Sequence, residues 1–162
     1  MTVSLDTYPK TGQLMPDYIF TTLAGRRVPL SSHDRRYSLV MVFADGASCA
    51  PCTSLLAGLA RRYEEFKSVH GEVLAVVHRS LEEASALTLS ERLPFQVVVD
   101  ADGEVHRTVG AVAADGGVPL VVYVTDRYGY IYQVFRVAEG EDAPTPDEIL
   151  DWLQYIDIEC PE

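Results

Sequence analysis

The chain has 162 residues, 48% of them hydrophobic, which is enough for one well-buried core but short for two. Its 24 acidic and 13 basic residues give a net charge of −11, which opposes nonspecific attraction to nucleic acid or anionic lipid. No stretch approaches the roughly 20 apolar residues of a membrane span, and the N-terminus lacks the pattern of a signal peptide. We therefore expect a single cytoplasmic domain over residues 1–162, with a core at about 12–156, a flexible tail at 157–162, and no nucleic-acid or membrane partner.

Hydrophobic periodicity and turn residues predict alternating strands and helices. In chain order, the expected elements are a hairpin-like entry over 17–30 that turns at Gly25, a strand at 38–44, a helix at 51–68, a strand at 72–78, a helix at 80–92, a strand at 95–99, a strand pair at 118–125 and 130–137, and a last helix at 145–156. The order strand, helix, strand implies a parallel crossover, whereas the tight turn at 126–129 implies an antiparallel pair. The sheet is expected to be mixed.

Two cysteines lie one helical turn apart, just after the first buried strand. Cys49 is placed at or near the start of the helix, where unpaired N–H groups and the positive end of the helix dipole stabilise a thiolate. We therefore predict that Cys49 is the nucleophile. Cys52, one turn further in, is close enough to attack a mixed disulfide on Cys49 and is predicted to be the resolving thiol.

Other interpretations of the pair stay open. Cys49 and Cys52 could be half of a zinc site completed by Cys160 or a histidine, although no second Cys-x-x-Cys and no His-x₃-His follows. They could also be two inert core cysteines. Cys160 itself falls in a polar tail and is expected to be an exposed thiol without a role.

The order of the elements, together with several motifs, resembles the thioredoxin-like fold. The segments that carry the resemblance are 12–17, 39–43, 94–95, 100–103, 118–119 and 126–129, with the cysteine pair between them. Within that superfamily the chain is most similar to the redoxin branch that includes the alkyl-hydroperoxide-reductase and thiol-specific-antioxidant relatives. The implied fold is α/β, with a mixed central sheet flanked by helices and an N-terminal hairpin-like extension.

The resemblance also implies a substrate-facing strand start. Val118-Pro119 is expected to be a cis peptide opposite the cysteine pair, with Val118 offering backbone hydrogen bonds to a substrate segment. The predicted function is that of a thiol-disulfide oxidoreductase. Its partners would be a thiol reductant and a disulfide-bearing protein or small molecule, and no metal or organic cofactor is required because electrons pass between sulfurs.

Two alternatives differ in the expected chemistry. Peroxiredoxins place Thr or Ser three residues before the peroxidatic Cys, whereas Gly46 stands three before Cys49. Because this part of the peroxidase motif is absent, a thiol-dependent peroxidase ranks second among the hypotheses. Ser48 also stands where thioredoxins usually carry Trp. The third hypothesis is a nonenzymatic interaction module whose partner surface is formed by some of the nine Tyr residues. His78 is expected at a strand end, where it has two possible roles. It could tune the reactivity of the thiols, or it could be a structural residue.

Overall fold

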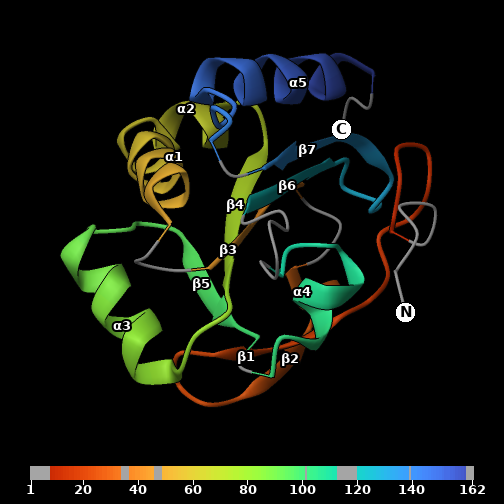
Figure 1. Cartoon of the computed structure of the whole chain (residues 1–162). Helices are drawn as coiled ribbons and strands as arrows, with labels where there is room; N and C mark the ends of the chain where they lie inside the picture. Colours follow the sequence, from red (N-terminus) through yellow and green to blue (C-terminus); the bar gives the residue numbers. More distant parts are fainter. Residues whose placement is uncertain are drawn as a thin grey trace.

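A seven-stranded mixed sheet forms the centre of the computed structural model, which describes residues 8–33, 37–45, 49–100, 102–112, 120–138 and 140–159. The strands are β1 (Ile19–Thr22), β2 (Arg27–Pro29), β3 (Ser38–Ala44), β4 (Gly71–Val77), β5 (Gln96–Val99), β6 (Leu120–Thr125) and β7 (Ile131–Val137). Their order across the sheet is β2-β1-β5-β4-β3-β6-β7 (Figure 1). β3, β4 and β5 run parallel to one another. All the remaining neighbouring pairs are antiparallel. The expected mixed sheet is confirmed.

The helices divide unequally between the two faces of the sheet. They are α1 (Ala50–Arg61), α2 (Tyr63–Ser68), α3 (Leu81–Ser90), α4 (Glu104–Thr108) and α5 (Pro146–Glu159), with a short 3-10 turn, η2, at Leu30–His33. Side chains of α1, α2, α3 and α5 form one core layer with the sheet, whereas α4 and the N-terminal segment form a second layer with the opposite face. The thioredoxin-like α/β arrangement expected from the sequence is confirmed.

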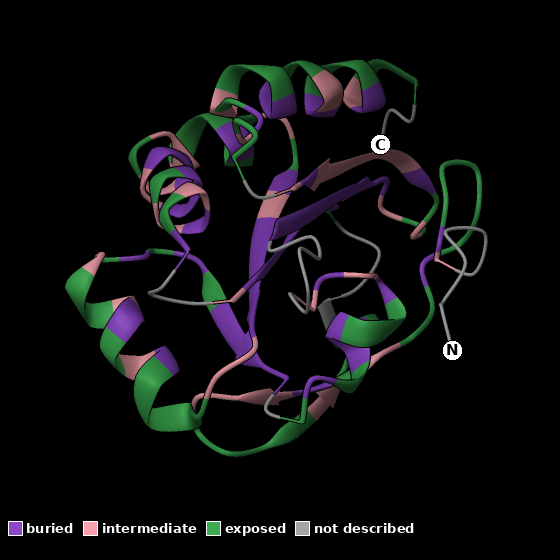
Figure 2. Ribbon diagram, viewed as in Figure 1, coloured by how far each residue is buried: buried purple, intermediate pink, exposed green. Residues whose placement is uncertain are grey.

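β3 shows how the sequence builds both layers at once. All seven of its residues are buried, and because successive side chains of a strand point to opposite faces, Val40 and Val42 join the layer of α1 while Met41 and Phe43 join the layer of α4. Figure 2 shows the consequence, a buried central sheet between helices whose outer faces are exposed. A strand with two buried faces needs a continuous apolar run rather than alternation, which is what residues 38–44 supply.

The helix predicted at 51–68 is in fact two helices that meet at Arg62. The Arg62 backbone departs from helical geometry, with φ −113° and ψ 15°, and its guanidinium binds Glu65 of α2 and Asp147 of α5. The two carboxylates raise the pKa of Arg62 further above its usual range. The break therefore lets α2 turn toward α5, a contact between distant segments that periodicity along one helix does not reveal.

Two features at the ends of helices could not be expected from hydrophobic periodicity. Gly71 is the first residue of β4, and the residue in the left-handed conformation before it is His70, with φ 59°. Gly71 is needed for space, because a Cβ there would lie 2.6 Å from Leu153 Cδ1. The five-residue helix α4, which follows β5 in the chain, was not among the predicted elements. Among the described helices, none is both long and apolar enough to cross a bilayer.

Candidate active site

Cys49 and Cys52 lie where β3 passes into α1. Cys49 is the N-cap of α1, with the extended backbone that an N-cap requires, and Pro51 occupies the first turn, where a missing N–H costs nothing. The Cys52 N–H donates to Cys49 Sγ at 3.2 Å. A sulfur thus takes the capping role that Ser or Asp usually fills, and it sits at the positive end of the helix dipole.

The two sulfurs are joined in a disulfide, with the Cα atoms 5.2 Å apart. Cys52 is fully buried and Cys49 is 7% exposed, so a reagent from solvent reaches Cys49 first. The disulfide closes within a single helical turn, so both cysteines can meet without unfolding α1. This geometry brings together the two residues that the sequence singled out.

The strand end that precedes Cys49 is held through two carbonyls. The carbonyl of Ala44, the last residue of β3, accepts a hydrogen bond from the His78 backbone N–H at 3.1 Å and faces His106 Nε2 at 3.2 Å. One residue further, the Asp45 carbonyl accepts from Arg79 Nε at 2.6 Å, and the Arg79 guanidinium also lies 3.5 Å from the Asp45 carboxylate. The end of β3 is therefore fixed at Ala44 and Asp45.

His106 and Asp100 form a buried hydrogen-bonded pair that sequence reasoning missed. Its Nδ1 lies 2.8 Å from Asp100 Oδ2, and its backbone N–H donates to the same oxygen at 2.7 Å. Burial opposes ionisation of Asp100, but these hydrogen bonds outweigh it and hold the pKa of Asp100 below its usual value. The one available signal was the position of Asp100 just before a helix start, where a carboxylate can accept from first-turn N–H groups.

His78 packs against the ring of His106, on the face of the sheet away from the cysteines. Its ring lies 5.2 Å from that of His106, and it presses on Gly103, where a Cβ would come within 2.6 Å of His78 Nε2. Phe43 completes the surroundings with an edge-to-face contact to His106 at 5.6 Å. Because Phe43 belongs to the layer of α4, the histidines occupy the sheet face opposite Cys49 and Cys52.

Three residues of interest lie outside the described part of the chain. Val118 and Pro119, predicted to face the cysteine pair through a cis peptide, are not among the described residues, and neither is Cys160. The register pairs Leu120 with Ala44, so β6 begins at the cysteine-bearing end of β3. Within the described ranges, no group of three or more His, Cys, Asp or Glu side chains is arranged to hold a metal ion.

Comparison with known proteins places this site in a family. The model of the AhpC/TSA family matches residues 11–134, which is most of the chain. Peroxiredoxins from Ignicoccus hospitalis and Hyperthermus butylicus are each 27% identical, over 93% of this chain and 67% of theirs. The chain therefore belongs to the AhpC/TSA family, and it is an oxidoreductase of the thioredoxin-like redoxin branch, as the sequence motifs indicated.

Solved structures agree on the fold. Peroxidoxin BcpB from Mycobacterium tuberculosis superposes with a TM-score of 0.76 at 16% identity, over 96% of this chain and all of that chain. A reduced 2-Cys peroxiredoxin from Plasmodium vivax gives 0.77 at 14% identity, over 92% and 82%. A putative thiol:disulfide interchange protein from Chlorobium tepidum gives 0.69 at 18% identity, over 93% and 97%. At these identities the likeness concerns the fold alone.

Proposed function

We propose that this protein is a thiol-dependent peroxidase that reduces a hydroperoxide at Cys49 and is recycled through the Cys49–Cys52 disulfide. The observation that carries the proposal is this disulfide at the N-terminus of α1, in a chain of the AhpC/TSA family. The sequence alone favoured disulfide exchange and put peroxide reduction second. The peroxiredoxin relatives support the reverse order.

The first step is attack on the peroxide. The Cys49 thiolate bonds to one oxygen of the hydroperoxide, the O–O bond breaks, and the departing alkoxide or hydroxide takes up a proton. Cys49 is then a sulfenic acid and the product is an alcohol or water. The N–H of Cys52, which already donates to Cys49 Sγ, and the helix dipole both favour negative charge on this sulfur.

The second step closes the disulfide. The Cys52 thiolate attacks Cys49 Sγ, an S–S bond forms, and hydroxide leaves and is protonated to water. A Cα separation of 5.2 Å lets the bond form within the folded turn. An external dithiol then attacks the more accessible Cys49 sulfur, releases the Cys52 thiol, and leaves as its own disulfide after a second exchange.

The proposal is tested by peroxide consumption with dithiothreitol as the reductant. The Cys49→Ser variant should fall below about one hundredth of wild-type activity, because the attacking atom is lost. Cys52→Ser should consume peroxide in a first turnover and leave a sulfenic acid on Cys49 that dimedone traps. Cys160→Ser is the matched control and should keep wild-type turnover. Peroxide consumption that survives in Cys49→Ser would contradict the assignment.

Thiol-disulfide exchange is the second candidate, because the resolving thiol already lies in the first turn of α1. The same set of variants separates the two functions when insulin disulfide reduction is measured in parallel. A wild-type chain that reduces insulin but leaves peroxide unconsumed supports exchange. If the wild type does neither, an interaction module without catalysis is favoured.

A further inference from the structure

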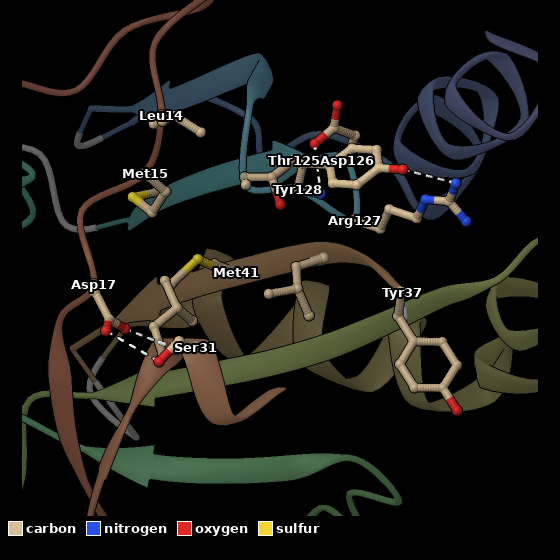
Figure 3. Close-up of a pocket in the computed structure, with 13 residues that line it drawn as sticks. Leu14, Met15, Asp17, Ser31, Tyr37, Met41, Thr125, Asp126, Arg127 and Tyr128 are labelled. Carbon is tan, nitrogen blue, oxygen red and sulfur yellow. Dashed lines mark hydrogen bonds between the residues drawn. The ribbon is translucent and has the colours of Figure 1, made fainter. Parts of the chain in front are cut away.

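A pocket of about 210 Å³ opens at the end of the sheet far from the cysteines. Its walls come from the N-terminal segment at 14–17, from η2, from the first half of β3 and from the turn between β6 and β7 (Figure 3). Leu39 and Met41 line it, and they belong to the layer of α4, whereas the cysteines belong to the layer of α1. Ala44 lies five residues beyond Leu39 in β3, which is about 16 Å along the strand. The pocket is therefore distinct from the candidate active site.

Thr125 supplies the polar atom that points to a ligand. Its side chain lines the pocket and is only 1% exposed, and its Oγ1 has no hydrogen-bond partner among the described residues. A buried hydroxyl without a partner is costly, and most are found paired. A ligand group that reaches Oγ1 would satisfy it.

The two carboxylates in the pocket wall are already engaged. Asp17 accepts from the Ser31 N–H at 2.7 Å and from the Ser31 hydroxyl at 3.0 Å. Asp126 Oδ1 accepts the N–H groups of Tyr128 and Tyr130 at 2.9 and 3.0 Å. Arg127 also lines the pocket, with its guanidinium over the ring of Tyr128 and hydrogen-bonded to the Tyr128 hydroxyl. The two carboxylates outnumber this single guanidinium in a chain of net charge −11, so the pocket disfavours anions.

The apolar part of the wall favours an aromatic ring. Met15 and Met41 place their thioether side chains in the pocket, and the rings of Tyr37 and Tyr128 stand at its rim (Figure 3). Thioether sulfur makes favourable contacts with aromatic rings, and tyrosine rings add edge and face contacts. A cavity of about 150 Å³ is known to hold benzene, so this volume suits one ring or two small fused rings and is too small for a nucleotide or a drug-sized ligand.

We propose that this pocket binds a small, neutral, hydroxyl-bearing aromatic molecule, with its ring between Met15 and Met41 and its hydroxyl paired with Thr125 Oγ1. Binding here involves neither cysteine, so it stands or falls separately from the peroxidase assignment. The ligand class follows from three features together, namely the unpaired hydroxyl, the sulfur-rich apolar lining and the acidic rim.

The test is titration of the intact protein with phenol, toluene and benzoate, followed by the amide NMR shifts of the pocket residues. Phenol should shift the amides of residues 14–17 and 125–129 with a dissociation constant on the order of 1 mM, as expected for a ligand of seven heavy atoms. Benzoate should not bind. An absence of shifts at these amides with 10 mM phenol would overturn the proposal.

The role of Thr125 is tested by an isosteric change. Thr125→Val keeps the shape and removes the hydroxyl, so it should weaken phenol roughly 3- to 10-fold and leave toluene unchanged or tighter. Thr125→Ser keeps the hydroxyl and should retain the preference for phenol. Equal weakening of phenol and toluene in Thr125→Val would contradict a hydrogen bond at Oγ1. Peroxide consumption should be the same in all three proteins.

Discussion

The imidazole of His106 is held against Asp100, with Nδ1 2.8 Å from the carboxylate, while Nε2 faces the Ala44 carbonyl at 3.2 Å. Both ring nitrogens therefore face oxygen atoms, and the ring is held at both ends. The pair is buried, and it joins the ends of β3 and β5 to α4. A hydrogen-bonded pair on one face of the sheet thus holds the end of the strand that precedes Cys49 in the sequence.

Removing the ring of His106 should destabilise the fold. In His106→Leu, Asp100 keeps backbone donors but loses the hydrogen bond from the ring, and loss of a buried hydrogen bond to a carboxylate costs about 1.5–3 kcal/mol of the free energy of unfolding. Urea unfolding measures the loss. Arg107→Leu, one residue along the same helix and exposed, is the matched control and should change stability by less than about 0.5 kcal/mol. Equal stabilities of wild type and His106→Leu would contradict a stabilising role for this hydrogen bond.

The same pair predicts a dependence of stability on acid pH. Because hydrogen bonds lower the pKa of Asp100 in the folded state below its usual 3.8, the unfolded chain binds the proton more readily. The stabilisation is therefore complete above about pH 4 to 5 and is lost as the pH falls through the lowered pKa. Asp100→Asn should be less stable than wild type at pH 7, and the gap in unfolding free energy should narrow toward pH 2.5. A gap that is constant with pH would count against this explanation.

Gly103 is required by both its conformation and its neighbour. Its φ of +72° is left-handed, and a Cβ would lie 2.6 Å from His78 Nε2. Gly103→Ala should therefore cost more than the roughly 1–2 kcal/mol of left-handed backbone alone. In the His78→Ala background the steric part disappears and only the backbone part remains. Wild type, the two single variants and the double variant form a double-mutant cycle, and their thermal unfolding gives the coupling energy between the two positions. If the two stability losses add exactly, the contact of Gly103 with His78 is excluded.

Local patterns in the sequence predicted those parts of the fold that local physics determines. The seven-residue apolar run at 38–44 is β3, and the helices predicted at 145–156 and 80–92 are α5 and α3. In the structure a capping box begins each of them, with the Glu148 N–H donating to Thr145 Oγ1 at 3.2 Å and the Glu83 N–H donating to Ser80 Oγ at 3.2 Å. Each of these signals lies within a few residues of the structure it produces.

What the sequence missed depends on residues far apart in the chain. The Arg62 break is tied to Asp147, 85 residues later, and the contact of His106 with Ala44 spans 62 residues. α4 is only five residues long, which is too short for a helical period to be recognised. The cysteine pair itself was found because strand, N-cap and helix are consecutive, whereas the hydrogen-bonded pair of Asp100 and His106 lies on the opposite face of the sheet.

The accessibility of the two sulfurs predicts the order in which they react. In the reduced protein, a limiting amount of iodoacetamide should alkylate Cys49 at least about fivefold faster than Cys52, because Cys52 is fully buried and Cys49 occupies the N-cap. Peptide mass spectrometry of Cys160→Ser, which leaves only these two thiols, measures the ratio. Faster alkylation of Cys52 would reverse the proposed roles of nucleophile and resolving thiol.

Two tyrosines with buried hydroxyls, the buried Tyr123 and the half-buried Tyr18, offer a matched pair for the last prediction. The hydroxyl of Tyr123 donates to the Pro9 carbonyl at 2.9 Å and accepts from Arg136 at 3.3 Å. The hydroxyl of Tyr18 is also buried, but it has no partner among the described residues. Burial raises the pKa of both hydroxyls, so both are neutral near pH 7.

Deleting the same oxygen at the two positions should therefore have opposite effects. Tyr123→Phe leaves the Pro9 carbonyl without its donor and should lower the free energy of unfolding by about 1–2 kcal/mol. Tyr18→Phe removes a polar atom that lacks compensation and should leave stability unchanged or raise it by up to about 1 kcal/mol. Urea denaturation of both variants at pH 7 measures the difference. If Tyr18→Phe loses as much stability as Tyr123→Phe, then the Tyr18 hydroxyl has a partner of comparable strength, and the contrast drawn between the two positions is wrong.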